Sequence, residues 1–375
     1  MLPNLSNAVE YHYDKFPPKE LDYHKFVPEL LKATDAIARY DQMLKKMHNN
    51  EILLAPLRNQ EAVISSRMEG TISTMDEIMK YEADIIDDKP ETESNKDVRS
   101  EIIETYLYQR ALKNAQKGMQ DGHEISISLI KMIHKQLLTF GRGAMKAPGQ
   151  FKVEQNFLAG KKKNILFVPI RPEKLIDGLD TLLEYINRSE DPILIKTALM
   201  HLEFEALHPF QDGNGRIGRM LITLLLWKSG VISAPHFYIS GYLEEHKDEY
   251  IDTMRSVSSD GNWEEWCRFF LTAVAEQASA NLNVAEKIQD LYDNMKTEFS
   301  STLQSKWTVQ VLDFIFTYPV FRNNKFTSHS GIPPQTAAKF TKKLVEKKLL
   351  LMREPGSGRK AALYSFEPLM KLVRV

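Results

Sequence analysis

The amino-acid sequence predicts a mainly helical fold with one small β-hairpin and a C-terminal winged helix-turn-helix domain. Apolar stretches at 193–207 and 220–227 lie on either side of a short polar loop, which indicates helix, loop, helix. Two short strand-like runs surround a Gly/Lys/Asn turn within residues 155–169, which indicates a hairpin. Between residues 326 and 366, two helical runs with helix-turn-helix spacing are followed by two strand-like runs.

The composition is that of a soluble globular protein. The chain has 375 residues, of which 43% are hydrophobic and 26% are charged, so two or three domains with ample cores are expected. A net charge of −1 excludes a bulk attraction to nucleic acid or membrane lipid. The single cysteine, Cys267, excludes an internal disulfide and a cysteine-based metal cluster. The sequence shows neither a signal peptide nor an apolar run that could span a bilayer, so we expect a cytoplasmic location and no membrane contact.

Residues 1–120 form the first of three predicted domains, an N-terminal helical region. Apolar positions recur at helical spacing over residues 28–48, and a second helix is expected over residues 56–68. Gly70 follows that helix where a left-handed C-terminal glycine is common. The run Thr74-Met75-Asp76-Glu77 has the pattern of a capping box and opens a further helix.

Residues 121–282 form the second predicted domain, which contains the polar loop at 208–219. Gly213-Asn214-Gly215 lies where the second helix must begin, so free backbone N–H groups and the positive end of the helix dipole make an anion site. Arg216 and Arg219 are three residues apart, so they share a helix face and can reach the same anion.

Two further side chains in the loop suit nucleotide chemistry. Asp212 is a hard oxygen ligand for a Mg²⁺ ion that rides on phosphates. His208 is the one group in the loop that titrates near neutrality, as a general base should. The loop therefore indicates a polyphosphate nucleotide site beside a base. The alternative is a polar connection between two helices with an incidental histidine.

Residues 208–219 fill the pattern H-x-F-x-[D/E]-G-N-G-R-x-x-R, and in this the sequence resembles the Fic family. The resemblance implies a Fic-type helical bundle that transfers AMP from ATP to a Tyr, Thr or Ser hydroxyl of a target protein, with self-modification. The chain contains no P-loop pattern. The implied roles are ATP binding by Gly213, Asn214, Gly215, Arg216 and Arg219, with Arg219 on the γ-phosphate, Mg²⁺ binding by Asp212, and base catalysis by His208.

Ser65, Glu69 and Gly70 match [S/T]-x-x-x-E-[G/N], which resembles the inhibitory motif of Fic proteins. A carboxylate near Arg219 would pair with the guanidinium in a bidentate way. The arginine could then not hold the γ-phosphate, so we expect Glu69 to inhibit the enzyme. The alternative is a plain helix end, with the glutamate exposed and the serine solvated.

The hairpin at 156–168 resembles the Fic flap, whose exposed edge aligns a target segment by strand addition. The three lysines at 161–163 either keep that edge soluble or attract acidic substrates. Tyr242 and Tyr250 occupy positions that line the adenine pocket in similar proteins, and packing in the core is the alternative for both.

Residues 283–375 form the third predicted domain, a linker helix followed by a helix at 307–316 and the winged helix. Strands are expected at 349–352 and 361–366 around the turn at 355–358. Lysines and arginines from Lys339 to Lys360 give the domain a local basic excess, and one interpretation is DNA binding with the helix from Pro334 in the major groove. Protein docking or homodimer formation is the alternative.

Two other functions stay open for the whole chain. In the first, the same site removes AMP, and Glu69 aligns a water molecule. In the second, the protein is a DNA-binding regulator whose Fic site senses a nucleotide.

Overall fold

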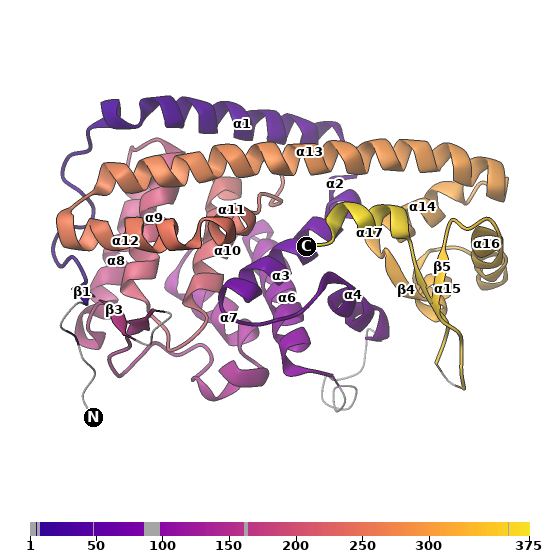
Figure 1. The fold of residues 1–375 in the computed structure, drawn as a ribbon, viewed down its shortest axis with the longest axis horizontal. Coiled ribbons are helices and arrows are strands. Elements are labelled where there is room, and N and C mark those ends of the chain that lie inside the picture. The colour runs from indigo at the N-terminus through magenta and orange to yellow at the C-terminus, as the bar shows by residue number, and fades with distance from the viewer. Residues whose placement is uncertain (1–4, 6–7, 48, 86–97, 161–163, 359) are drawn as a thin grey trace. The chain divides into compact units, whose positions relative to one another are not determined.

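A computed structural model describes residue 5 and residues 8–47, 49–85, 98–160, 164–358 and 360–375. The chain is mainly helical, as predicted (Figure 1). It divides into two compact units, Met1–Asp41 with Leu107–Ser279 and Gln42–Tyr106 with Ala280–Val375. Their boundaries differ from the three predicted domain ranges, since the second unit combines part of the N-terminal range with most of the C-terminal range. Each boundary between the units falls within a long helix that continues from one unit into the other. Those helices are α1 (Val27–Lys46), α6 (Ser100–Gln120) and α13 (Trp263–Leu303).

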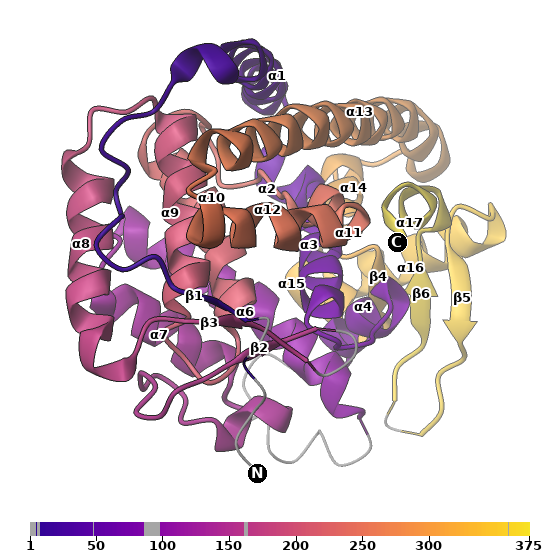
Figure 2. The ribbon, with the colours of Figure 1, turned by 60° about the vertical axis from the view of Figure 1, so that its left-hand side comes forward.

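The core of the first unit is the helix pair α9 (Ile193–Leu207) and α10 (Asn214–Lys228). Both helices are buried around almost their whole circumference, and polar residues such as Glu203 and Arg219 are buried with the apolar ones. They pack against each other, with α8 (Leu175–Arg188) against α9 and α7 (Ile127–Leu137) against α10 (Figure 2). Further helices of this unit are α11 (Ser240–Glu245) and α12 (Lys247–Asp260), with 3-10 turns at Tyr23–Lys25, Gly141–Met145 and Pro172–Lys174.

A small sheet in the first unit contains the predicted hairpin. Strands β2 (Leu158–Ala159) and β3 (Ile165–Val168) are antiparallel, with an irregular register, and lysines 161–163 lie outside the described residues. Strand β1 (Val9–Glu10), which the sequence did not predict, pairs in parallel with the other edge of β3, so the order is β1-β3-β2. Strand β3 is therefore paired on both sides, and β2 is the edge strand of the hairpin that another chain can reach.

A buried hydrogen-bond network holds the segment after β1 on the body of the unit. The Tyr11 hydroxyl donates to Glu203 Oε1 at 2.6 Å, and His12 Nε2 lies 2.9 Å from Glu203 Oε2. His12 Nδ1 lies 2.7 Å from the Ser258 hydroxyl, so one chain segment joins α9 to α12. Since these groups are buried and paired, they fix β1 beside β3.

The second unit contains the helices that were predicted in the N-terminal region. Helices α2 (Asn50–Leu53), α3 (Ala55–Met68) and α4 (Met75–Asp84) follow one another. Helix α3 ends in a Schellman motif, in which Gly70 has φ 83° and the Thr71 N–H donates to Ser66 O at 3.0 Å. The capping box at Thr74 and Glu77 is present, as predicted.

The C-terminal part of this unit combines four helices with a three-stranded sheet. The sheet is antiparallel in the order β4-β6-β5, and the two predicted strands are β5 and β6, each displaced by about two residues at its start. The order helix, strand, helix, helix, strand, strand is the one expected of a winged helix, and that assignment stays a prediction. The elements are α14 (Thr308–Thr317), β4 (Val320–Arg322), α15 (Asn323–His329), α16 (Pro334–Glu346), β5 (Leu351–Glu354), β6 (Leu363–Ser365) and α17 (Glu367–Val373).

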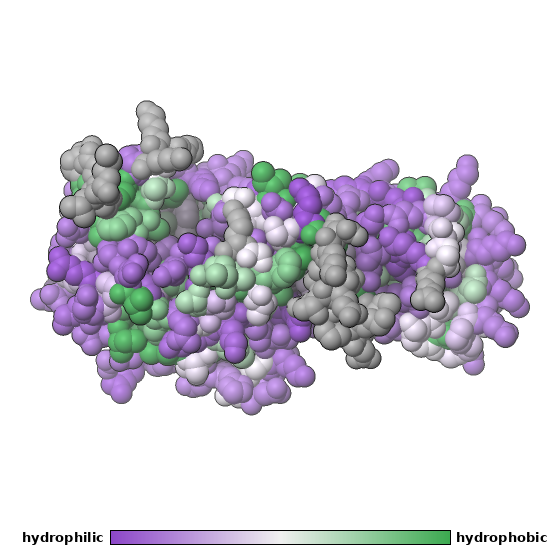
Figure 3. Space-filling view, turned by 90° about the horizontal axis from the view of Figure 1, so that it is seen from below, coloured by the Kyte–Doolittle hydropathy of each residue, from purple (hydrophilic) through white to green (hydrophobic). Residues whose placement is uncertain are grey.

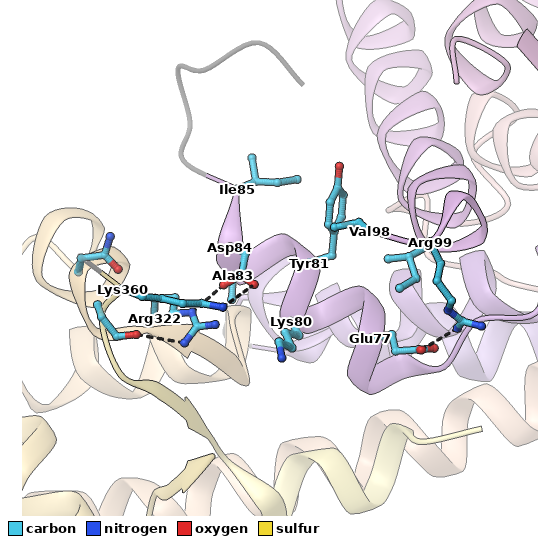
Figure 4. A pocket seen from close by; sticks show the side chains of 13 residues that line it. Glu77, Lys80, Tyr81, Ala83, Asp84, Ile85, Val98, Arg99, Arg322 and Lys360 are labelled. Carbon is cyan, nitrogen blue, oxygen red and sulfur yellow. Dashed lines mark hydrogen bonds and ion pairs between the residues drawn. The ribbon is translucent and has the colours of Figure 1, made fainter. Parts of the chain in front are cut away.

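Ion pairs tie this C-terminal part to both ends of α4. Asp76 at the start of α4 accepts from Arg374 at 2.8 Å and from Arg353 at 3.1 Å. Asp84 at its end accepts from Arg322 at 2.6 Å, and Arg322 is 3% exposed. A pocket of about 590 Å³ lies beside this second cluster (Figure 4). The four cations that line the pocket already have carboxylate partners, so its charge does not favour an anionic ligand; they are Lys80, Arg99, Arg322 and Lys360.

Among the described residues, no helix combines the length and the apolar character needed to cross a bilayer. Figure 3 shows one face of the molecule, on which hydrophilic residues surround small, separate hydrophobic patches.

Candidate functional site

The loop between α9 and α10 is built on two left-handed residues. Helix α9 ends at His208, which has φ 45° and ψ 62°, and α10 begins after Gly213, which has φ 80° and ψ 4°. A Cβ at position 213 would lie 3.3 Å from Leu137 Cδ2, so both the conformation and the space favour glycine. The predicted helix, loop and helix are confirmed.

Asn214 closes the loop through its side chain. The Phe210 N–H donates to Asn214 Oδ1 at 2.9 Å, and Asn214 Nδ2 donates to Phe210 O at 2.8 Å. Both ends of this buried amide are thus used inside the loop. A phosphate contact from Asn214 would therefore come from its backbone N–H.

Phe210 and His134 support the loop from beneath. The two rings stack with centroids 3.7 Å apart, and Phe210 is fully buried. The Gly149 N–H donates to His134 Nδ1 at 2.7 Å, so the ring proton lies on Nε2, which donates to Asp212 O at 3.0 Å. Burial lowers the pKa of His134 to about 4, so the imidazole is neutral at pH 7.

The start of α10 has the features of an anion site. The first N–H groups of a helix have no partner within it, and Gly213 supplies no capping side chain. Arg216 lies in the first turn with its side chain 3% exposed, and its Nη2 donates to Asp212 Oδ1 at 3.2 Å. Its Nε and Nη1 atoms are buried and have no hydrogen-bond partner among the described residues. A buried guanidinium with two unsatisfied donors is costly unless an anion can reach it.

Arg219 is one turn further along α10 and is also buried. Burial and, to a smaller extent, the charge of Arg219 lower the pKa of His201 to about 3, so this histidine is neutral and close to the arginine. The structure thus places both predicted arginines, with buried side chains, within the first two turns of α10.

Asp212 is the candidate metal ligand. Its carboxylate is 37% exposed and pairs with Arg216. Among the described residues, no cluster of three or more His, Cys, Asp or Glu side chains could hold a metal ion. Mg²⁺ is commonly held by one or two carboxylates together with substrate phosphates and water. A single carboxylate beside a phosphate site fits that pattern.

His208 is half-buried at the opposite end of the loop from Arg216. Its Nδ1 lies 3.3 Å from Glu205 O, which can only accept, so Nδ1 carries the proton of the neutral ring. In that tautomer Nε2 carries the lone pair, and a ring nitrogen with a lone pair is what a general base needs.

Sequence reasoning missed two residues that hold this loop, Lys152 and Asn156. Together they donate to four consecutive carbonyls, those of residues 207–210. Lys152 Nζ donates to Leu207 O at 3.0 Å, and the Lys152 N–H donates to Pro209 O at 2.9 Å. Asn156 Nδ2 donates to His208 O and to Phe210 O, both at 3.0 Å. No local pattern could reveal this arrangement, because the donors lie more than 50 residues before the acceptors.

The two candidate tyrosines lie in different surroundings. Tyr250 is 5% exposed and its hydroxyl lies 2.8 Å from His201 Nε2, which matches the packing alternative. Tyr242 is partly exposed, and its ring stacks on His246 with centroids 4.0 Å apart. A role of Tyr242 in an adenine pocket stays a prediction.

The candidate inhibitory residues belong to the second unit, at the end of α3. Ser65 is fully buried, so the alternative of a solvated serine is wrong, while Glu69 is exposed at the helix C-cap. The pairing of Glu69 with Arg219 stays a prediction.

Two family models match the chain: Fic/DOC family over residues 124–226 and Fic/DOC family N-terminal over residues 27–117. The protein adenylyltransferase fic-1 of Caenorhabditis briggsae is 32% identical over 115 residues, which are 30% of this chain and 21% of that protein. A probable protein adenylyltransferase of Aquifex aeolicus is 24% identical over 195 residues, 50% of this chain and 54% of that protein. The chain therefore matches about a fifth and about half of these two relatives.

A Fido domain-containing protein of Dictyostelium discoideum is 30% identical over 119 residues, which are 30% of this chain and 74% of that protein. The fold is similar to that of a Fic family protein from Desulfovibrio desulfuricans, with a TM-score of 0.57, 17% identity, and 93% and 98% of the two chains covered. It is also similar to Fic-1 of C. elegans, with a TM-score of 0.52, 19% identity, and 72% and 74% covered. Because the loop pattern, the fold and the family models agree, the chain belongs to the Fic/DOC family.

Proposed function

We propose that this protein is a protein adenylyltransferase, which transfers AMP from ATP to a Tyr, Thr or Ser hydroxyl of a target protein. The observation that carries the proposal is the buried guanidinium of Arg216 beside the start of α10, whose Nε and Nη1 have no hydrogen-bond partner in the part of the chain that the structure describes. His208 lies at the other end of the same loop, so a base is available next to a polyphosphate site. The relatives that are named protein adenylyltransferases support this choice of reaction.

The phosphates are bound by the start of α10. The α- and β-phosphates lie on the N–H groups of residues 213–215, where the helix dipole favours negative charge. Arg216 satisfies its buried donors on phosphate oxygens, and Arg219 holds the γ-phosphate. Asp212 would hold a Mg²⁺ ion together with phosphate oxygens, and this ion supplies charge neutralisation for the departing pyrophosphate.

His208 activates the target. Its Nε2 accepts the proton of the incoming hydroxyl, whose oxygen forms a bond to the α-phosphorus. The bond between the α-phosphorus and the bridging oxygen of the β-phosphate breaks, and pyrophosphate leaves with that electron pair. The loop is supported by the stacked rings of Phe210 and His134 and by the Asn214 side chain. Positioning and electrostatic stabilisation therefore provide most of the rate enhancement.

The target segment binds along the flap at 156–168. Strand β3 is paired with β1 and β2, so strand addition takes place on the outer edge of β2. The protein also modifies itself when one of its own hydroxyls reaches the site. Glu69 inhibits the reaction by pairing with Arg219, and the alternative is that Glu69 aligns a water molecule for AMP removal.

Labelled ATP tests the reaction type. We expect label from the α-phosphate of ATP to remain on the protein after denaturation, because AMP is attached covalently. Label from the γ-phosphate should leave with pyrophosphate. Retention of γ-label alone would identify a kinase and contradict the proposal.

A second candidate function, DNA binding by the C-terminal part, is favoured by one face of α16. Lys339, Lys342 and Lys343 are exposed on this helix, and Lys347 and Lys348 follow it. The cations near β5 are engaged elsewhere, since Arg353 pairs with Asp76 and Lys360 with Asp84. A DNA contact would therefore rest on α16 and on phosphates.

We expect the double variant Lys339→Glu/Lys343→Glu to abolish binding of the full chain to double-stranded DNA. Fluorescence anisotropy with a labelled duplex at low and moderate salt measures the effect, because phosphate contacts weaken as salt rises. The matched control is Lys287→Glu/Lys296→Glu, which changes two exposed lysines of α13. Equal binding by the two double variants would remove α16 as a DNA surface.

A further inference from the structure

Four consecutive carbonyls accept hydrogen bonds from one short segment of the chain: that of Leu207, the last residue of α9, and those of the three loop residues that follow it. The last carbonyls of a helix have no partner within it, and buried carbonyls must be satisfied by other donors. Here the carbonyls of residues 207–210 accept from Lys152 and Asn156. We name these two residues the loop clamp. Two of its hydrogen bonds, to Leu207 O and Pro209 O, flank His208, and a third is to the carbonyl of His208 itself.

The loop clamp acts on a residue that is not in a relaxed conformation. His208 has φ 45°, in the left-handed region, where the Cβ of a residue other than glycine is sterically crowded. Such a conformation persists only when its surroundings impose it. Because the direction of the imidazole follows from the backbone of His208, the donors that fix this backbone also fix the base.

The amine of Lys152 holds the loop by donating hydrogen bonds, in addition to the space that the side chain fills. The residue is 3% exposed, and burial lowers the pKa of its amine to about 7. An apolar side chain of similar length would fill the space without this desolvation cost. Its Nζ reaches both Leu207 O and, at 2.9 Å, Asn156 Oδ1, so the two clamp residues also orient each other.

Asn156 is also the first residue of the flap, two positions before β2. The segment that is proposed to receive the target and the loop that carries His208 are thus connected through the Asn156 amide. A shift of the flap relative to α9 would be transmitted to His208 through the Nδ2 bonds to residues 208 and 210.

We propose that Lys152 and Asn156 are positioning residues that hold His208 in register with a target strand bound to the flap. The proposal rests on the proposed function, in which His208 is the base. It assigns the clamp to the chemical step and not to nucleotide binding, because its donors reach the carbonyls of residues 207–210, on either side of His208. Phe210 O is shared with Asn214 Nδ2, whose backbone N–H remains available to the phosphate site.

The test uses Lys152→Met and Asn156→Ala in the full chain. We expect each change to lower kcat for α-label incorporation by about 10- to 100-fold, since small misplacements of a catalytic group have effects of this size. The Kd for ATP should change by less than about threefold, because the phosphate site is untouched. Lys152→Arg, which restores a cationic donor, should recover part of the lost kcat.

Two matched controls separate this role from general packing. Lys196→Met removes a lysine that donates to a carbonyl, that of Ser189 at 2.6 Å, next to the opposite end of α9. Asn114→Ala removes an asparagine that donates to Gln136. We expect neither control to lose more than about twofold in kcat, on the scale of small effects away from the site.

The outcomes test the positioning role of the loop clamp separately from the proposed function. If folded clamp variants, checked by circular dichroism, keep the kcat of the controls, or lose ATP affinity in parallel with kcat, the positioning role is overturned. Should Lys152→Met fail to fold, the half-buried Asn156 gives the decision through Asn156→Ala. If His208→Ala itself keeps full activity, the proposed function fails independently of the clamp.

Discussion

His208→Ala is expected to lower AMP transfer by about 10²- to 10⁴-fold, the usual contribution of a general base. The change removes the imidazole but leaves the N–H groups of residues 213–215 and the buried guanidinium of Arg216. ATP should therefore bind with a Kd within a few fold of the original value. The measurements are the initial rate of α-label incorporation and equilibrium binding of ATP.

Two further variants make this result interpretable. His208→Asn cannot accept the proton, yet asparagine tolerates the left-handed conformation at this position, so the loop is preserved. Arg216→Ala should instead weaken both ATP affinity and rate, because its donors contact phosphate. A His208→Asn protein that labels itself at the original rate would exclude His208 as the base.

Glu69→Gly is expected to raise AMP transfer by at least about tenfold, which corresponds to about 1.4 kcal/mol of released inhibition. If Glu69 pairs with Arg219, its removal frees the guanidinium, which then gains the γ-phosphate as a new partner. Glu69 is exposed at a helix C-cap with φ −91° and ψ 8°, where glycine is tolerated, so the fold should survive. Glu69→Asp should activate less, because the shorter side chain keeps its charge and loses reach.

The assay is the initial rate of α-label incorporation into the protein itself and into a cell lysate at saturating Mg²⁺. Adding Arg219→Ala to Glu69→Gly should return the rate to a low level, since the γ-phosphate then loses its partner. Glu346→Gly, an exposed glutamate at the end of α16, is the matched control and should leave the rate unchanged. An unchanged rate in Glu69→Gly would leave Ser65 to Gly70 as an ordinary helix end. Loss of AMP removal from premodified protein would favour the opposite reaction.

The sequence alone determined the features that depend on neighbouring residues. Gly213 predicts the start of α10, Gly70 predicts the end of α3, and Thr74 with Glu77 predicts a capping box, and all three are present. Each of these signals is completed within about one helical turn, so no knowledge of the distant chain is needed. The nucleotide motif belongs to the same class, because its N–H groups and arginines lie on one loop and one helix.

The tertiary structure alone decided the features that join distant segments. The pairing of β1 with β3 brings Val9 opposite Phe167. A strand of two residues is too short to show the alternating pattern from which a strand is predicted. The packing of Tyr250 on His201 likewise depends on which helices meet, since a tyrosine suits a pocket and a core equally well.

The loop clamp and the division into units follow the same rule. Lys152 and Asn156 reach carbonyls 52 to 57 positions later, and only the packing of the flap segment against α9 brings these atoms within 3.0 Å. The units combine distant ranges because α1, α6 and α13 each continue from one unit into the other. Local sequence specifies the conformation of the backbone, whereas the partner of each buried polar group is chosen when distant segments pack and must satisfy one another's hydrogen bonds.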